Sequence, residues 1–349
     1  MIKYKILVKD HSGNSLGEFQ NFRNLKFGKR LNNYGTCTFD VLVNDLKASQ
    51  LIALRLYTVW IYRVSDDSTD LLWAGEQALR SGSLDDKGSG WVTITCYDWL
   101  EQLNSRYTVA EKIYSYQSGS DIVTDLIDTT QADTHGDLGI TQGTIEETTW
   151  REKTYTNQNI MEAIISLANL QDGFDFEINN GKVLNIQNFI GIDRSDTVFL
   201  EFGVNVKSMR ITEDFSKPVN RAIVLGQTSD VGDQIRVERD DTTLETTYGL
   251  REGQTSQLEV SDLAAIQANG DAFIRKYGSP VIKVSMDIVR STTPTIVDFA
   301  LGDLIRVIVQ KGIYDIDETF RVFEWNVMYG TDNTETLTLT LGNFNLGDE

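Results

Sequence analysis

The sequence predicts a mainly β protein with a smaller α+β part, in which two similar β-barrel domains flank an α+β domain. Three observations support this fold class. Short segments that alternate apolar and polar residues dominate the first and last thirds of the 349-residue chain. Two helical patterns interrupt them in the middle. The spacing of the β segments in the first third recurs in the last third.

Composition narrows the possible functions. The apolar fraction of 40% is typical of a folded soluble protein, and the length favours two or three domains. The 51 acidic and 32 basic residues give a net charge of −19, which opposes stable binding of nucleic acid. An acidic wall would still let DNA slide past as a transient passenger. No apolar run is long enough to cross a bilayer, and the N-terminus alternates like a strand, so neither a membrane-spanning segment nor a signal peptide is expected.

Residues 1–105 are expected to form the first β-barrel domain. A hairpin should form where IKYKILV turns at HSGN and returns through LGEFQNF. The segment LNNYGTCTFDVLVND (31–45) alternates from Cys37 onward and predicts a strand. After it, we expect a short helix over 45–54 and strands over 57–64, 71–81 and 91–98.

Residues 106–207 are expected to form the α+β domain. Apolar residues recur at helical spacing over 120–130, where Ser120 is a candidate N-cap, and over 157–170. The segment GFDFEINNGKVLNI predicts a hairpin with Asn180-Gly181 at its turn.

Residues 208–349 are expected to form the second β-barrel domain. The strand NRAIVLG (220–226) precedes an acidic and helical insertion at about 227–278, whose helix over 261–278 is capped by Ser261. Strands are then expected in PVIKVSMDIV, LGDLIRVIVQ, TFRVFEWNVMYG and ETLTLTLG.

The two β regions have matching patterns, which indicates an internal duplication. In each, a strand is followed by three more at similar spacing; Trp73 and Trp325 occupy the third strand, and VTITC and TLTLT form the last. A chain with two such domains can close into a homotrimer that presents six similar β modules. Closure would pair edges that a small barrel leaves open, and a hollow acidic ring would account for both the repeat and the charge.

The alternating segment after Cys37 supplies the candidate site. One face should lie in the barrel core, and its residues are Cys37, Phe39, Val41 and Val43. The other face mixes apolar with polar side chains, which suits a subunit contact or the wall of a bore, and its residues are Thr38, Asp40, Leu42 and Asn44.

The order of these features resembles the baseplate hub, or tail-tip hub, proteins of tailed bacteriophages. The first part of the resemblance lies in TCTFDVLVND, YTVWIYRV followed by LLWAGEQ, and WVTITCYDWLEQLNSR. The rest lies in the helix before GFDFEINNGKVLNI, in VNRAIVLG, in ALGDLIRVIV, and in TFRVFEWNVMYG followed by TLTLTLGNF. These pieces follow one another in the family's order over most of the chain.

The resemblance implies a structural virion protein at the tail tip or baseplate, assembled in the host cytoplasm. It implies a homotrimer whose two tube-like β domains form a pseudo-sixfold ring that closes the tail tube, adapts it to a threefold tip and forms part of the DNA passage. The implied partners are the tail tube or distal tail ring, the tape measure protein and the tip or fibre proteins. The chain stops just after its last strand, so a C-terminal lysin or fibre extension, found in many hubs, is not expected.

The sequence gives little support to an enzyme or to a bound cofactor. Gly13-Asn14-Ser15-Leu16-Gly17 matches the GxSxG nucleophile motif, but a returning strand follows it instead of a helix. His11 and His135 lack a second ligand at metal-binding spacing, and Cys37 and Cys96 are expected to be small core residues. The alternatives are a carbohydrate- or receptor-binding β-rich adhesin module and, with less support, a secreted β-rich hydrolase.

Overall fold

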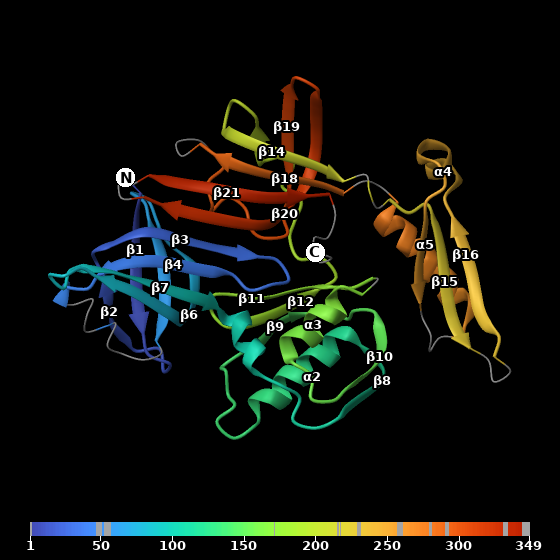
Figure 1. Cartoon of the computed structure of the whole chain (residues 1–349), viewed down its shortest axis with the longest axis horizontal. Helices are drawn as coiled ribbons and strands as arrows, with labels where there is room; N and C mark the ends of the chain where they lie inside the picture. Colours follow the sequence, from blue (N-terminus) through green and yellow to red (C-terminus); the bar gives the residue numbers. More distant parts are fainter. Residues whose placement is uncertain are drawn as a thin grey trace.

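The computed structural model describes residues 2–46, 51, 57–170, 172–214, 216, 218–228, 232–256, 261–278, 281–289, 293–330 and 334–343. The predicted architecture, mainly β with a smaller α+β part, is confirmed. The helix expected over 45–54 lies mostly outside the described residues. The α+β part lies below two β regions in Figure 1, and an orange subdomain projects to the side.

The first β module consists of strands β1 to β7. Within it the order is β2-β1-β5-β6-β7-β4-β3, and all neighbouring strands are antiparallel. The predicted strands over 57–64, 71–81 and 91–98 are confirmed. The bounds are β1 (Lys3–Lys9), β2 (Ser15–Phe19), β3 (Phe22–Arg30), β4 (Thr36–Leu42), β5 (Thr58–Val64), β6 (Thr69–Leu84) and β7 (Gly90–Asp98).

The segment that was expected to return as one strand after the first turn forms two. β2 pairs with β1, whereas β3 begins three residues after β2 ends and pairs with β4. The chain therefore changes direction near Asn21, and β3 lies at the opposite edge of the module from β2.

The second β module contains the predicted last four strands and two preceding ones. Its main order is β14-β18-β21-β20, and β19 pairs with β20 and with β13. The bounds are β13 (Phe199–Glu201), β14 (Val206–Asp214), β18 (Val281–Ile288), β19 (Leu304–Lys311), β20 (Tyr314–Tyr329) and β21 (Glu335–Gly342).

The two β modules repeat one pairing pattern. Strands β3-β4-β7-β6-β5 of the first correspond in order to β14-β18-β21-β20-β19 of the second. The match extends to irregularities, because a bulge at Ala78 between β6 and β7 recurs at Phe323 between β20 and β21. Side chains repeat as well: Asp40 accepts a hydrogen bond from Thr93 at 2.7 Å, and Asp287 accepts one from Thr338 at 2.7 Å.

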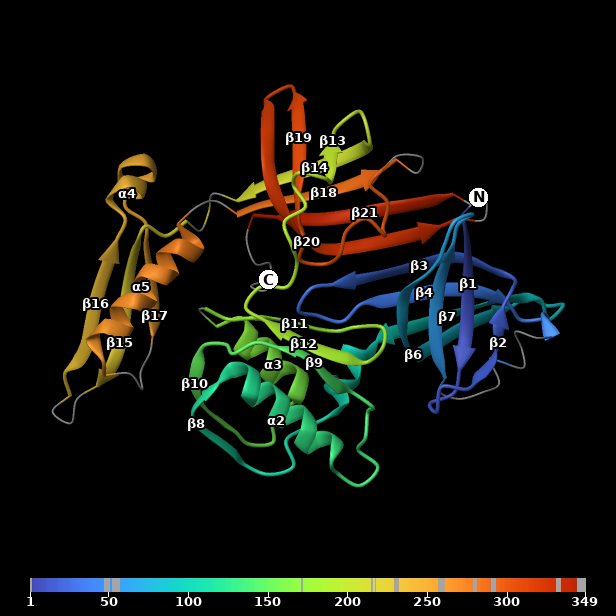
Figure 2. The ribbon, with the colours of Figure 1, turned by 180° about the vertical axis from the view of Figure 1, so that it is seen from behind.

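One continuous sheet joins the modules. The second half of β20 pairs with β21 on one side and with β3 of the first module on the other. Figure 2 shows β3 and β4 lying directly below β20 and β21. The apolar side chains of both modules form a single core, in which Phe27 packs edge-on against Trp325 with ring centroids 5.8 Å apart.

The α+β part has a separate core. Helix α3 begins after Asn159, whose side chain accepts a hydrogen bond from the Glu162 amide, and it buries Ile160, Ile164 and Leu167 as its spacing predicted. The elements are η1 (Trp99–Ser105), β8 (Lys112–Ser118), α2 (Gly119–Gln131), β9 (Thr141–Ile145), β10 (Trp150–Tyr155), α3 (Ile160–Ala168), β11 (Asp175–Ile178) and β12 (Val183–Gln187). β8 pairs with β10, and β11, β12 and β9 form a second small sheet.

The insertion forms a small subdomain between β14 and β18. Strand β15 (Arg221–Thr228) pairs with β16 (Gln234–Asp240) and with β17 (Glu252–Ser256), so the insertion starts earlier than the expected 227. Helix α5 (Leu263–Tyr277) packs on this sheet, and α4 (Thr242–Tyr248) joins β16 to β17. The N-cap of α5 is Asp262 and not the expected Ser261.

Candidate functional site

The predicted contact face lies on β4 beside the core of the first module. Cys37, Phe39 and Val41 are fully buried, as expected, whereas Val43 is half-buried in the turn that follows β4. On the other face, Thr38 and Asp40 are half-buried and Asn44 is exposed. Leu42 is 37% exposed and pairs with Trp91 of β7. Whether another subunit covers this face stays a prediction.

The Asp40 carboxylate is hydrogen-bonded to three side chains on that side of the sheet. It accepts hydrogen bonds from Thr93 Oγ1 at 2.7 Å, Asn24 Nδ2 at 2.8 Å and Arg23 Nε at 3.4 Å. Burial alone would raise the pKa of Asp40, but these hydrogen bonds outweigh it and lower the pKa. The Arg23 guanidinium also lies 3.6 Å from the centre of the Trp91 ring. The face is therefore a structured, charged surface.

The pairing of β20 with β3 is the main contact between the β modules. It runs from Glu324 opposite Arg30 to Tyr329 opposite Leu25. Gly28 sits within it, where a Cβ atom would lie 2.2 Å from Oδ1 of Asn326 and 2.5 Å from the carbonyl oxygen of Trp325. Only glycine permits this close approach.

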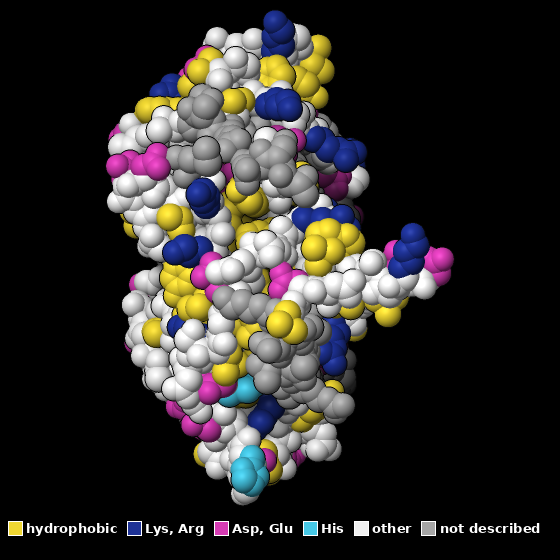
Figure 3. Space-filling model, turned by 90° about the vertical axis from the view of Figure 1, so that its left-hand side faces the viewer, with side chains coloured by type: hydrophobic (Ala, Val, Ile, Leu, Met, Phe, Trp, Pro, Cys, Tyr) yellow, Lys and Arg dark blue, Asp and Glu magenta, His cyan; other side chains and the backbone are white. Residues whose placement is uncertain are grey.

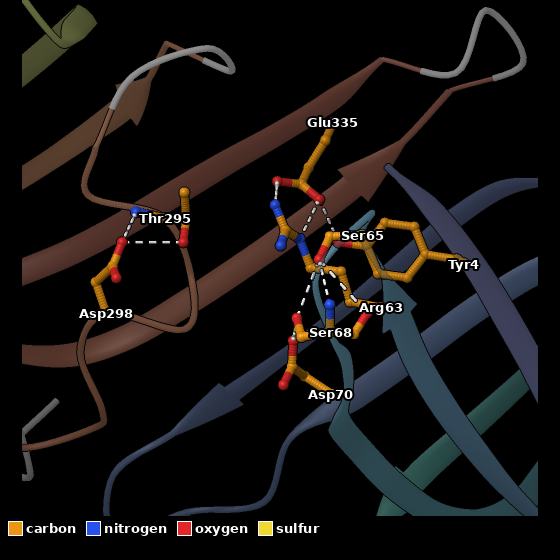
Figure 4. A network of polar contacts seen from close by, with 8 residues as sticks. All are labelled: Tyr4, Arg63, Ser65, Ser68, Asp70, Thr295, Asp298 and Glu335. Atoms are coloured by element: carbon orange, nitrogen blue, oxygen red, sulfur yellow. Dashed lines mark hydrogen bonds and ion pairs between the residues drawn. The ribbon is translucent and has the colours of Figure 1, made fainter. Parts of the chain in front are cut away.

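A buried ion pair lies at one end of this contact (Figure 4). Arg63 of β5 donates to Glu335 of β21 through Nε at 3.0 Å and Nη2 at 3.4 Å, and the Tyr4 hydroxyl donates to the same carboxylate at 2.6 Å. All three side chains are at most 7% exposed. Burial, followed by the Glu335 carboxylate, raises the pKa of Tyr4, so the phenol stays protonated as the donor. These contacts bind β1 and β5 of the first module to β21 of the second.

A second buried ion pair connects three parts of the chain. The Asp175 carboxylate of β11 accepts a hydrogen bond from Nη2 of Arg321 in β20. It also accepts hydrogen bonds from Nδ2 of Asn32, in the loop after β3, at 2.9 Å and from the Ile190 amide at 2.9 Å. Arg321 Nη2 also donates to the Ile190 carbonyl at 2.7 Å. The α+β part is thereby attached to both β modules through one carboxylate.

These two ion pairs could not be predicted from the sequence, because their members are far apart in the chain. Arg63 and Glu335 are separated by 272 positions, and Arg321 and Asp175 by 146. The one local signal was a charged residue at a position where the strand pattern calls for an apolar one, as at Arg63 between Tyr62 and Val64.

The residues considered for catalysis or metal binding lie in turns, in a loop and in the core, with Cys37 directly opposite Cys96 between β4 and β7. Gly13 lies in the turn between β1 and β2, with φ of 84°, and Ser15 begins β2, so the GxSxG match is a hairpin turn. His11 lies 3.7 Å from Glu76, and His135 sits in a loop with φ of 60°. Cys37 and Cys96 are buried free thiols, as expected of core residues. Within the described part of the chain, no three His, Cys, Asp or Glu residues converge as a metal site.

The surface charge is mixed on the face that Figure 3 shows. Acidic and basic side chains alternate there with apolar patches, and no single-sign wall covers that face. Among the helices that the structure describes, none is long and apolar enough to span a membrane.

Comparisons with known proteins give matches in structure only. No family model matches the sequence, and no curated protein matches it either. A 43 kDa tail protein of the prophage MuSo2 from Shewanella oneidensis superposes with a TM-score of 0.70 at 12% identity, covering 97% of this chain and 98% of that one. A tail protein from Neisseria meningitidis gives 0.66 at 15% identity, with 97% and 96% covered.

Two further solved structures are similar to this chain in fold. The prophage tail protein gp18 from Listeria monocytogenes gives a TM-score of 0.64 at 13% identity, covering 99% of this chain and 95% of that one. A type VI secretion component from E. coli, described as similar to the T4 tail proteins gp27 and gp5, gives 0.53 at 9% identity, with 98% and 76% covered. At these identities the likeness concerns the fold: the chain has the fold of these phage tail proteins.

Proposed function

We propose that the chain is a structural tail protein, a homotrimeric baseplate or tail-tip hub that closes the end of the tail tube. Its six β modules would form a pseudo-sixfold ring above a threefold tip. The tail tube or distal tail ring would bind one side of this ring, and the tape measure protein and tip or fibre proteins would complete the assembly.

The observation that carries this proposal is the residue-level repeat of the two β modules. The shared strand order, the bulges at Ala78 and Phe323, and the Asp40 and Asp287 networks make the modules quasi-equivalent. Quasi-equivalent modules within one chain are what a threefold protein needs to contact a sixfold partner. The fold shared with phage tail proteins supports the same assignment.

The charge of −19 suits a passage for DNA. Acidic walls repel phosphate and disfavour binding, so DNA would pass through the ring without being retained. The proposed role needs no chemistry.

The mass of the assembled particle tests the proposal. Light scattering on the purified chain should give about three times the 39.3 kDa chain mass, and electron microscopy should show a threefold ring with a central hole. A particle of one chain mass, both alone and mixed with its tail tube protein, would reject the hub.

The β4 face gives a second test. Leu42→Asp should weaken trimer formation without lowering the melting temperature, because Leu42 is 37% exposed and lies at the end of its strand. Leu250→Asp is the matched control, since Leu250 is 54% exposed and lies in the insertion. If both variants assemble like the wild type, the face carrying Thr38, Asp40, Leu42 and Asn44 contacts solvent.

A further inference from the structure

We infer that neighbouring copies of this chain join through antiparallel pairing of the second half of β6 in one copy with β14 of the next. This inference rests on the proposed ring, and it adds the two strands, their register and the residues that meet. The pairing of β20 with β3, which already joins the two modules within one chain, is the basis for it.

Two sheet edges in the described structure have no strand beside them. Beyond Gln77, β6 pairs with β7 alone, and Leu79 and Leu84 on this segment are 59% and 63% exposed. β14 pairs with β18 along its length and, among the described strands, has no ladder on its other side. An open edge of this length normally pairs or is protected, because it is a template for another strand.

The internal repeat relates these two edges. By the shared strand order, β6 corresponds to β20 and β14 corresponds to β3. The strands β20 and β3 pair with each other inside the chain. If each module contacts the next in the same way around the ring, the equivalent contact is β6 with β14 of the following copy.

The bulges fix the equivalence of β6 and β20 at single residues. Aligning Ala78 with Phe323 places Leu79 with Glu324 and Leu84 with Tyr329, because both segments keep the same register against β7 and β21.

The hydrogen bonds of Asp40 and Asp287 determine which residues of β3 and β14 correspond. Asn24 donates to Asp40, and Ser208 donates to Asp287. Aligning Asn24 with Ser208 places Leu25 with Met209 and Arg30 with Asp214.

Transferring the register of β20 and β3 gives the pairs between copies. Glu324 opposite Arg30 becomes Leu79 opposite Asp214, and Tyr329 opposite Leu25 becomes Leu84 opposite Met209. The intervening pairs are Arg80 with Glu213, Ser81 with Thr212, Gly82 with Ile211, and Ser83 with Arg210.

These pairs are chemically compatible. Arg80 and Glu213 are both exposed and carry opposite charges, which stabilises a directly opposed pair. Leu84 would cover Met209 and Ile211, two half-buried apolar residues at the margin of the core. At the position of the Gly28–Asn326 pair, Thr212 would lie opposite Ser81, and the Cβ atom of Thr212 requires a wider strand separation there than β3 and β20 have at Gly28.

Disulfide trapping tests the register directly. The double variant Ser81→Cys with Thr212→Cys should, on oxidation, give covalent dimers and trimers on a non-reducing gel. The control Ser81→Cys with Lys207→Cys places its second thiol on the same strand but roughly 16 Å away along β14, too far for a disulfide. The native thiols of Cys37 and Cys96 are buried, so the wild type should give no ladder.

Charge reversal provides an independent measurement. Arg80→Glu should weaken association about threefold to tenfold at each interface, because it opposes two carboxylates, and Glu213→Arg should do the same. Combining both changes should restore the wild-type assembly. Circular dichroism should stay unchanged, since both side chains are exposed.

The outcomes separate this inference from the proposed function. A trimer that neither forms the Ser81–Thr212 crosslink nor responds to Arg80→Glu would overturn the strand pairing and leave the hub intact. A chain that stays monomeric and uncrosslinked at high concentration would overturn both. A crosslink in the register control as strong as in the test pair would also overturn the assigned register.

Discussion

At the scale of single residues, buried charges hold the parts of this chain together. Asp175 is 1% exposed and Arg321 is 7% exposed, and their ion pair joins β11 to β20. Such a pair adds little net stability compared with an apolar contact, but it is costly to break on one side only. Its value here is geometric, because the Asp175 carboxylate has a partner in each of three structural parts.

Arg321→Met should therefore lower the free energy of unfolding by about 3–5 kcal/mol, since it leaves the Asp175 carboxylate buried without its cation. Urea denaturation measures this loss. The matched control is Arg306→Met, which breaks the Arg306–Asp317 pair whose side chains are 43% and 44% exposed. That exposed pair should contribute less than about 1 kcal/mol. Equal losses in the two variants would contradict the structural role of Asp175.

Asp98 should make stability depend on pH. Burial raises the pKa of this carboxyl from its ordinary 3.8 to about 6, although Lys29 and the amides of Gly35 and Leu100 oppose the rise. The folded state therefore holds the proton more tightly than the unfolded state does. Its contribution to stability is fully present below about pH 4 and is lost as the pH rises to about 6, with a magnitude of about 3 kcal/mol.

The comparison of Asp98→Asn with the wild type isolates this effect. Urea midpoints at pH 4, 5, 6 and 7 should show a stability decline in the wild type that the variant lacks. Asp193→Asn is a control of opposite sign, because hydrogen bonds from Ser195 lower the pKa of the exposed Asp193. Parallel profiles for the wild type and Asp98→Asn would show that the folded state does not raise the pKa of Asp98.

At the scale of elements, the alternation of apolar and polar residues predicted where most strands lie, but not which strands pair with each other. β5, β7, β19 and β21 each bury one face, so their sequences carry a period of two. β14 is mostly exposed and its apolar residues are few, so the pattern that marks a half-buried strand is weak there. Likewise α2 begins at Gly119 and not after the expected cap Ser120, which bonds to Ser118 and Thr148 inside the α+β part.

The contact of β3 with β20 shows why the site itself could not be predicted. Alternation tells which side chains share a face, but it does not tell which two strand edges will meet when about 300 residues separate them in the chain. The candidates Thr38, Asp40 and Leu42 on β4, with Asn44 in the turn after it, were predicted as one face of a strand. The chain instead joins its modules at strand edges and through buried charges.

Gly28→Ala should disrupt that contact. The added Cβ would overlap the Trp325 carbonyl oxygen, a backbone atom that cannot rotate away, so β3 and β20 must separate locally. Overpacking of this kind costs about 1–3 kcal/mol and should raise amide hydrogen exchange in both strands. Gly181→Ala is the control, because its Cβ would meet only Asn179 Oδ1 at 3.3 Å. Exchange rates in β3 that match the wild type would show that this close approach does not limit the pairing.

At the scale of the whole molecule, the chain combines two β modules that share one core with an inserted subdomain that has its own core. The α+β part is fastened to the two modules by Asp175 and Asn32. The inserted subdomain instead has its own core, in which Ile266 and Ile274 of α5 cover Ala222 and Val224 of β15. Figures 1 and 2 both show it standing clear of the first β module.

The inserted subdomain should therefore be removable. Asp214 of β14 and Val281 of β18 lie directly opposite each other in the antiparallel ladder, so the strands can be joined by a two-residue Asn-Gly turn in place of residues 215–280. The shortened chain should fold, assemble to the same number of copies and melt within a few degrees of the wild type, as measured by light scattering and calorimetry. The matched control removes only α5, which uncovers Ala222 and Val224 and should cause aggregation. A shortened chain that aggregates like the control would mean that the two β modules need the insertion in order to fold.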